Sequence, residues 1–218
     1  MSERVACGFS QYSVGKTTFI RNVVGKDFGQ RIGPEPTTDK FTVVFHGEDG
    51  VIIPGNALAM QADKPYRPLT KFGVGFLDRF EGASADAKIL EQLTFVDTPG
   101  VLAGEKQRAG RGYDFNRIAA HFAARADMIL LLFDANKLDV SDEMRDVITS
   151  MQAHYSKLKV ILNKADTCNQ QQLMQVHGAV MWALSPVIKT PEVARMHTRN
   201  PVTTFHPPGH PLRDCSCA

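Results

Sequence analysis

The chain has 218 residues, a formal net charge of +2, and 43% hydrophobic residues. This length suits a single α/β core, and the near-neutral charge does not favour a nucleic-acid-binding protein. No apolar run is long enough to be a transmembrane helix, and no signal peptide leads the chain. The four cysteines, Cys7, Cys168, Cys215 and Cys217, lack metal-site spacing and a disulfide framework. These features indicate a cytoplasmic protein with reduced thiols.

The first predicted element is a strand over 5–9, which leads into the octet Ser10-Gln-Tyr-Ser-Val-Gly-Lys-Thr17 and then into an apolar, helix-like stretch. This is the context of a phosphate-binding P-loop, because N–H groups at a helix start favour an anion. Lys16 is expected to reach the β- and γ-phosphates, and Thr17 to ligate Mg²⁺. The predicted nucleotide contacts are Ser10, Gln11, Tyr12, Ser13, Val14, Gly15, Lys16, Thr17 and Thr18.

The first position of the octet departs from the P-loop pattern, because Ser10 stands where glycine is usual. If φ must be positive there, a serine costs roughly 1 kcal/mol or more. We therefore expect strain at Ser10 or weaker nucleotide binding. The Gly15-Lys16-Thr17 corner alone is also compatible with an ordinary helix start that carries an exposed lysine.

A Pro-rich stretch over 33–39 precedes a predicted strand over 41–45. A threonine in such a loop can ligate Mg²⁺ and contact the γ-phosphate. Thr38 is the candidate for this role and for positioning the attacking water, with Thr37 as the alternative. A plain turn is the other interpretation of this stretch.

A second candidate sensor of the γ-phosphate follows the predicted strand over 93–96, where the sequence is Asp97-Thr-Pro-Gly100. An aspartate at the carboxyl end of a parallel strand is typical of the Walker-B carboxylate, which holds Mg²⁺ through its water shell. Gly100 can offer its N–H to the γ-phosphate and allow the following loop to move. A common Asp-Thr-Pro-Gly turn is the alternative.

The candidate base-reading element is Asn163-Lys-Ala-Asp166, after a predicted strand over 159–162. In this pattern Asn163 braces neighbouring loops, the Lys164 stem lies over the purine, and Asp166 accepts hydrogen bonds from ring N–H groups. An aspartate that pairs with two guanine donors favours GTP.

The order of these elements predicts the fold class. The apolar run over 127–133 suits a central parallel strand covered on both faces, and Ser141 with two acidic residues after it predicts the next helix start. Strands that alternate with helices indicate an α/β domain with a doubly wound, mostly parallel sheet, the P-loop NTPase fold, with the ligand at the carboxyl ends of the strands.

Several segments of the chain resemble the EH-domain-containing (EHD) ATPases, over about residues 5–195. These dynamin-related proteins have a dynamin-like nucleotide domain, bind membranes, oligomerise and remodel endosomal tubules. The resemblance is carried by Gln11–Ile20, Arg31–Asp39, Pro54–Leu58, Asp97–Gly100, Gly104–Arg108, Arg111–Phe115, Leu132–Ala135, Asn163–Asp166, Gln171–Met174 and Gly178–Trp182.

The resemblance implies ATP as the preferred nucleotide, although the base-reading element alone favours GTP. It also implies slow hydrolysis stimulated by assembly on membranes. Val101 follows Gly100, and an apolar side chain cannot orient water as the glutamine of small GTPases does. We therefore expect a slow ATPase of endocytic membrane trafficking, with Thr38 and Lys16 as its catalytic residues. The family location is the cytoplasm and the peripheral endosomal membrane.

The two ends of the chain are expected to depart from the family. Family members carry a helical segment before the first strand, and a sixth strand, a lipid-binding helical region and an EH domain after about residue 195. The stretch over 197–218 is rich in Pro, Thr and His, and it is predicted to be a disordered tail on a nucleotide-binding domain over 1–196. We expect an incomplete sixth strand with an uncovered edge, in a truncated or frame-shifted product or a short form. Cys215 has the spacing of a prenylation site or ends an unrelated tail.

A helix predicted over 171–188 carries an apolar stripe of Leu173, Val176, Val180, Leu184 and Val187. Trp182 falls roughly opposite that stripe at 100° per residue, and Met181 lies between. The resemblance implies that nucleotide domains pair through this helix, so both residues are candidates for a homodimer interface. A core tryptophan under a neighbouring element is the alternative.

Two other functions stay open at this point. The first is a GTPase of the same fold. The second is a non-enzymatic adaptor that pairs with full-length relatives and blocks their assembly, which Ser10 and the unusual chain ends suggest.

Overall fold

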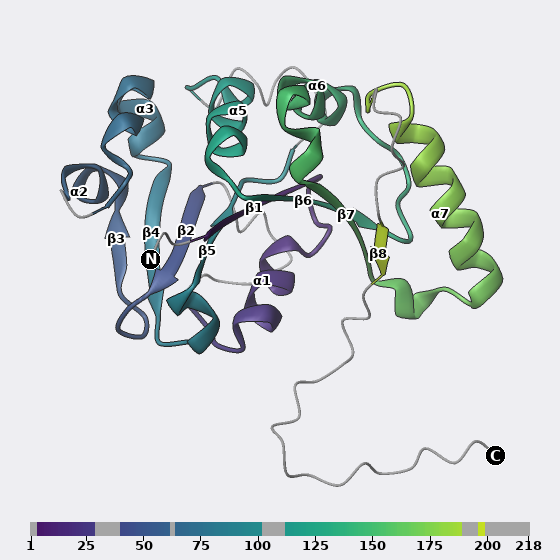
Figure 1. The fold of residues 1–218 in the computed structure, drawn as a ribbon, viewed down its shortest axis with the longest axis horizontal. Helices are drawn as coiled ribbons and strands as arrows, with labels where there is room; N and C mark the ends of the chain where they lie inside the picture. Colours follow the sequence, from purple (N-terminus) through teal and green to yellow (C-terminus); the bar gives the residue numbers. More distant parts are fainter. Residues whose placement is uncertain (1–3, 29–39, 62–63, 102–111, 189–195, 199–218) are drawn as a thin grey trace, which may run out of the picture.

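The computed structural model describes residues 4–28, 40–61, 64–101, 112–188 and 196–198. These residues form an eight-stranded sheet in the order β3-β4-β2-β5-β1-β6-β7-β8, with helices on both faces (Figure 1). The half that holds the P-loop consists of parallel strands β1 (Arg4–Ser10), β5 (Leu93–Asp97), β6 (Met128–Asp134) and β7 (Leu158–Asn163). The prediction of a mostly parallel α/β sheet is confirmed, and the carboxyl ends of these strands share one edge.

The other half of the sheet begins where strand direction reverses. Strand β2 (Phe41–His46) pairs antiparallel with β5 and parallel with β4 (Phe80–Ala85), and β3 (Ile52–Pro54) pairs antiparallel with β4. Short helical elements connect these strands, and their brevity explains why no periodic pattern predicted them. They are α2 (Gly55–Met60), η1 (Arg67–Phe72), α3 (Val74–Leu77) and η2 (Lys88–Glu91).

The longer helices begin at the residues that local chemistry favours. Helix α5 (Phe115–Arg125) follows Asp114, whose carboxylate accepts a hydrogen bond from the Arg117 N–H at 3.1 Å. Helix α6 (Asp142–Ser150) begins after Ser141, as predicted, and the Ser141 hydroxyl accepts from the Met144 N–H at 3.3 Å.

Helix α7 (Gln170–Leu184) starts at a reciprocal capping box between Asn169 and Gln172. It ends four residues before the predicted limit of 188. Short 3₁₀ segments η3 (Gln152–Lys157) and η4 (Ala165–Thr167) flank strand β7.

Apolar side chains fill both faces of the sheet. On the face of α3, α5 and α6, the Phe41 ring stacks on Phe122 and meets the Phe76 ring edge-on, with centroids 5.6 and 5.4 Å away. Ring pairs of this kind contribute about 1 kcal/mol each beyond area burial. On the other face, helix α1 (Lys16–Val24) buries Ile20 and Val24. This packing fixes the start of α1 against the ends of β1 and β5.

A short strand lies where the sequence predicts an incomplete sixth strand, and it includes the first two residues of the predicted tail. Strand β8 (Met196–Thr198) pairs parallel with β7, with Ile161 opposite His197. Three residues are too few to give a periodic signal, and the unpaired edge of β7 supplies the partner that orders them. Among the described residues, β8 is the outermost strand on this side of the sheet. The rest of the predicted tail lies outside the described residues.

His121, on α5, packs against the Phe72 ring and near the cations of Lys71 and Arg125. Burial, and then the charges of Lys71 and Arg125, lower its pKa from 6.5 to about 4. Between these two pH values the unfolded chain takes up a proton that the folded chain does not. The free energy of unfolding therefore falls as the pH drops from 6.5 towards 4.

We expect this group to account for a loss of about 1 kcal/mol between pH 7 and pH 4, after allowance for solvent screening of a partly exposed ring. Urea unfolding of the parent and of His121→Gln across this range measures the effect, and the variant should show the shallower pH dependence. His177→Gln, on the exposed side of α7, is the matched control. Equal slopes for His121→Gln and the parent would contradict the prediction.

Candidate nucleotide-binding site

The P-loop connects the end of β1 to the start of α1. Gly15 has φ 88° and Ser13 has φ 65°, so two residues of the loop lie in the left-handed region. Ser10 is the last residue of β1, pairs with Leu132 of β6 and has no positive φ. The prediction of backbone strain at Ser10 is therefore wrong. The residue that carries a left-handed cost of roughly 1–2 kcal/mol is Ser13.

Lys16, Thr17 and Asp97 converge at the start of α1. The Lys16 Nζ atom donates to Asp97 Oδ1, and the Thr17 hydroxyl donates to Asp97 Oδ2 at 2.6 Å. Asp97 is fully buried and Lys16 is 5% exposed. The ammonium neutralises a carboxylate that would otherwise be buried and unpaired, which is strongly unfavourable.

These same oxygens fit a Mg²⁺ ion. Mg²⁺ takes hard oxygen ligands and usually completes its shell with water and substrate phosphates. A threonine hydroxyl and a buried carboxylate lie within hydrogen-bond distance of each other at the start of a helix. Within the described part of the chain no cluster of three His, Cys, Asp or Glu side chains could hold a metal ion. A Mg²⁺ ion held by Thr17 and Asp97 would complete its shell with water and substrate phosphates.

The loop after β5 is hydrogen-bonded to the P-loop. The Val101 N–H donates to the Ser10 carbonyl at 2.9 Å, and the Tyr12 N–H donates to the Val101 carbonyl at 3.1 Å. A Cβ atom on Gly100 would lie 2.9 Å from the Tyr12 Cα atom. Only glycine fits this approach, so Gly100 lies beside the backbone that is expected to wrap the phosphates.

Asn163 and Lys164 join the base-reading loop to the P-loop. The Asn163 amide donates to the Val14 carbonyl at 2.9 Å. Lys164, at φ 59°, donates to the Ser13 carbonyl at 3.3 Å and to Asp134 Oδ2 at 2.6 Å. Asp166 lies on the exposed side of η4. The loops that the sequence assigns to phosphate and to base thus form one connected surface.

Three polar residues of this surface were not singled out from the sequence. The Asp134 carboxylate pairs with Lys164 and accepts from the Asn136 N–H at 2.9 Å. The Asn136 amide donates to the Thr167 hydroxyl at 3.0 Å. Asp134 ends a central strand beside the P-loop, and that position was the signal that could have identified it.

Cys7 lies on β1, under the P-loop lysine. Burial, and to a smaller extent the charge of Asp97, raise the pKa of its thiol, against the lowering effect of Lys16. A thiol held in the protonated form is neither a nucleophile nor a metal ligand. Cys7 is therefore a packing residue.

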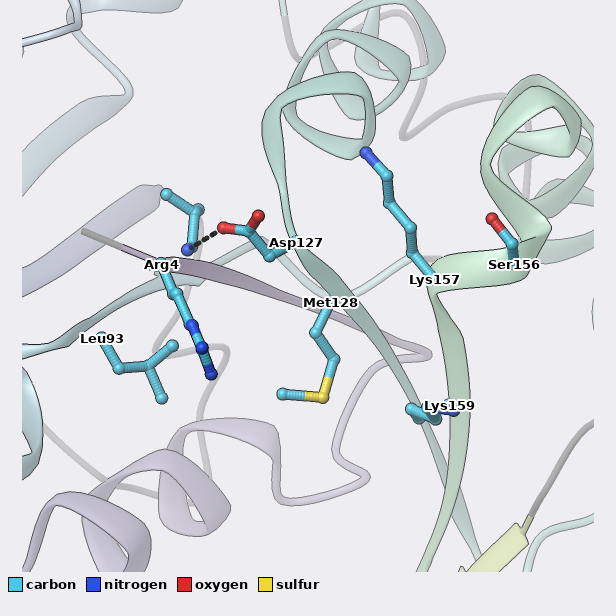
Figure 2. A pocket seen from close by; sticks show the side chains of 8 residues that line it. Arg4, Leu93, Asp127, Met128, Ser156, Lys157 and Lys159 are labelled. Atoms are coloured by element: carbon cyan, nitrogen blue, oxygen red, sulfur yellow. Dashed lines mark hydrogen bonds between the residues drawn. The ribbon is translucent and has the colours of Figure 1, made fainter. Parts of the chain in front are cut away.

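A pocket of about 370 Å³ lies at the opposite edge of the sheet, by the amino ends of the parallel strands (Figure 2). Arg4, Leu93, Met128 and Lys159 are among its lining residues. Asp127 at its rim accepts a hydrogen bond from the Val5 N–H at 2.8 Å. No residue of the P-loop, the Asp97 loop or the base-reading loop lines it, so this pocket is separate from the candidate site.

The structure does not test the predicted roles of Thr37 and Thr38, because both threonines lie outside the described residues.

The candidate interface residues lie on helix α7. Trp182 is 84% exposed on α7, whereas Val176, Val180 and Leu184 are buried. The interpretation of Trp182 as a core residue is therefore wrong, and Met181 beside it is partly buried.

The geometry agrees with the comparisons with known proteins. A family described as "50S ribosome-binding GTPase" matches residues 9–164. EH domain-containing protein 2 of Arabidopsis thaliana is 55% identical over 188 residues, which are 86% of this chain and 34% of that protein. EH domain-containing protein 1 of Homo sapiens is 53% identical over 188 residues, 86% of this chain and 35% of that protein. The chain thus spans about a third of the length of these relatives.

Solved structures share the fold at low sequence identity. A structure of an oligomerised bacterial dynamin pair has a TM-score of 0.64 at 14% identity, and covers 92% of this chain and 33% of its own. Aquifex aeolicus Era bound to GDP and AlF₄⁻ has a TM-score of 0.54 at 15% identity, and the match covers 92% of this chain and 52% of the Era chain. The chain belongs to the P-loop GTPase family, and within it corresponds to the nucleotide-binding part of the EH domain-containing proteins.

Proposed function

We propose that this chain binds a Mg²⁺-nucleoside triphosphate, prefers ATP to GTP, and hydrolyses it slowly. The observation that carries the proposal is the convergence of Lys16 and Thr17 on the buried Asp97 carboxylate at the start of α1. A polyphosphate at this helix start would meet backbone N–H groups, an ammonium group and the oxygen ligands of Mg²⁺ at once.

The proposed roles follow from what each group can do. Lys16 binds the β- and γ-phosphates, Thr17 and Asp97 hold Mg²⁺, and Gly100 contacts the γ-phosphate. Mg²⁺, when bound, neutralises charge on the phosphate oxygens. Thr38 positions the attacking water. Val101 is apolar and buried, so it offers no hydrogen bond to that water, which supports slow turnover.

The choice of base rests on a different set of groups. Lys164 is held over the P-loop by Asp134 and Ser13, and Asp166 is exposed beside it. Asp166 suits the donors of guanine, whereas the resemblance to EHD proteins supports adenine. We therefore propose that contacts beyond Asn163, Lys164 and Asp166 determine the preference for ATP.

Calorimetric titration of the chain with ATP and with GTP, each with Mg²⁺, tests this proposal. Tighter binding of ATP is the expected result. Tighter binding of GTP would overturn the base preference and favour a GTPase. No heat with either nucleotide, from a folded chain, would overturn nucleotide binding and favour a non-enzymatic adaptor.

We also propose a homodimer formed through α7. Trp182 is 84% exposed and Met174, on the same helix, is 73% exposed. Gly178 lies between them, and a Cβ there would meet nothing within 4 Å. Large exposed apolar side chains beside a small residue suit a helix that packs against a partner.

Replacing Trp182 by alanine is expected to weaken the dimer about tenfold or more, because buried interface tryptophans commonly contribute 2 kcal/mol or more. Sedimentation velocity across a concentration series measures the dissociation constant. Met60→Ala, which removes an equally exposed apolar side chain on α2, is the control and should leave the constant unchanged. An unchanged constant for Trp182→Ala would rule out this interface.

The cellular setting is proposed from the family. Among the described residues no helix is long and apolar enough to cross a bilayer. We propose a cytoplasmic protein that acts at the periphery of endosomal membranes in endocytic trafficking.

A further inference from the structure

The Asp134 carboxylate lies at a fixed point beneath the base-reading loop. Asp134 is the last residue of β6, is 8% exposed, and is the register partner of Asn163 at the end of β7. Its Oδ1 atom accepts a hydrogen bond from the Asn136 N–H at 2.9 Å, and its Oδ2 atom accepts one from Lys164 Nζ at 2.6 Å. A side chain on the end of a central strand, with both oxygens engaged, is held more precisely than one on a loop.

The Lys164 ammonium takes its position from Asp134 rather than from the P-loop. The Nζ atom lies 2.6 Å from the Asp134 carboxylate and 3.3 Å from the Ser13 carbonyl oxygen. The bond to the carboxylate is the stronger of the two because both of its partners are ionised. The backbone of Lys164 is held as well, since the Thr167 hydroxyl donates to the Lys164 carbonyl at 2.7 Å. The Ser13 carbonyl therefore meets an ammonium group that the base-reading side of the site has placed.

The backbone of Ser13 explains why the P-loop needs such a contact. Ser13 has φ 65°, a left-handed conformation that costs a serine more free energy than a glycine. Gly15, at φ 88°, carries no such cost. The carbonyl of Val14, between these two residues, accepts from the Asn163 amide at 2.9 Å. Two hydrogen bonds from the base-reading loop thus hold the one part of the P-loop whose backbone is unfavourable.

We propose that Asp134 is a positioning residue for the phosphate-binding loop. It fixes the Lys164 ammonium, and that ammonium keeps Ser13 in its left-handed conformation. The inference rests on the proposed binding of a Mg²⁺-nucleoside triphosphate, and it gives a role to a carboxylate that acts through other residues. If Lys164 served only to cover the base, the conformational cost at Ser13 would have no influence on what Asp134 contributes. The two roles therefore differ in whether Asp134 and Ser13 are energetically coupled.

A double-mutant cycle on the full chain measures this coupling by calorimetric titration with ATP and Mg²⁺. Asp134→Asn keeps the shape of the side chain and removes its charge. We expect it to weaken ATP binding about tenfold, since a hydrogen bond between ionised groups is replaced by a weaker one. The loss should be the same with Mg²⁺ and in EDTA, because Asp134 holds a lysine and no metal.

Replacement of Ser13 by glycine is the second arm of the cycle. A glycine takes the left-handed conformation without help, so Ser13→Gly should regain most of the lost affinity when it is added to Asp134→Asn. In the parent background the turn is already held, and Ser13→Gly should change the affinity by about twofold or less. Asp139→Asn makes the same substitution at an exposed aspartate between β6 and α6 and should bind like the parent. Urea unfolding of every variant confirms that the titrated chains are folded.

Two results would overturn the proposal while leaving nucleotide binding in place. The first is equal ATP affinity of Asp134→Asn and the parent. The second is additivity, in which Ser13→Gly changes the affinity by the same factor in both backgrounds, because that result limits Asp134 and Lys164 to the base. A folded parent that binds no ATP would instead remove the proposed function and this inference together.

Discussion

Replacement of Lys16 by methionine is expected to abolish measurable nucleotide binding, with a loss of affinity of about 100-fold or more. The ammonium would donate charge-assisted hydrogen bonds to phosphate, and each such bond contributes about 1.5–3 kcal/mol. The same change removes the partner of a fully buried carboxylate. We therefore also expect the free energy of unfolding to fall by about 3–5 kcal/mol.

A double variant separates these two effects. Lys16→Met/Asp97→Asn removes both charges, so it should regain most of the lost stability while still failing to bind nucleotide. Urea unfolding and calorimetry on the two variants and the parent provide the measurement. Recovery of binding together with stability would show that Lys16 acts only through folding.

Replacement of Asp97 by asparagine is expected to remove the Mg²⁺ dependence of nucleotide affinity. In the parent, a polyphosphate must draw Lys16 away from Asp97, and this leaves a buried carboxylate that Mg²⁺ can neutralise. We therefore expect Mg²⁺ to strengthen binding of nucleotide to the parent by about tenfold or more. In Asp97→Asn, Lys16 has no competing carboxylate, so affinity in EDTA should rise above that of the parent and Mg²⁺ should add little.

Asp134→Asn is the matched control for this experiment. It neutralises another carboxylate of the same surface, one that pairs with Lys164 rather than with Lys16. The control should keep the Mg²⁺ dependence of the parent. Retention of the full Mg²⁺ effect in Asp97→Asn would assign the metal to other ligands.

The phosphate end of the site was largely predictable because its chemistry is local. A strand, a turn and a helix start bring Gly15, Lys16 and Thr17 to one place, and the end of a neighbouring parallel strand brings Asp97. Contacts between loops were not predictable. The left-handed conformation of Ser13, the Asp134–Lys164 pair and the Val101 hydrogen bonds depend on how loops distant in sequence pack.

The strands of the first half of the sheet were also predictable, since they are continuous apolar runs next to recognisable loops. The elements over 46–92 could not be predicted in the same way. The elements β3, α2, η1 and α3 are only three to six residues long, which is too short for a periodic apolar pattern. Strand β8 is set by its partner β7 rather than by its own sequence. Short elements of this kind are fixed by tertiary packing.

The antiparallel join between β2 and β5 places Thr42 directly opposite Asp97. The Thr42 hydroxyl donates to Glu81 Oε1 on β4 at 3.2 Å, and β4 begins three residues after helix α3 ends. A continuous run of hydrogen-bonded strands thus links the candidate triphosphate site to the end of the molecule that carries Met60 and Val74.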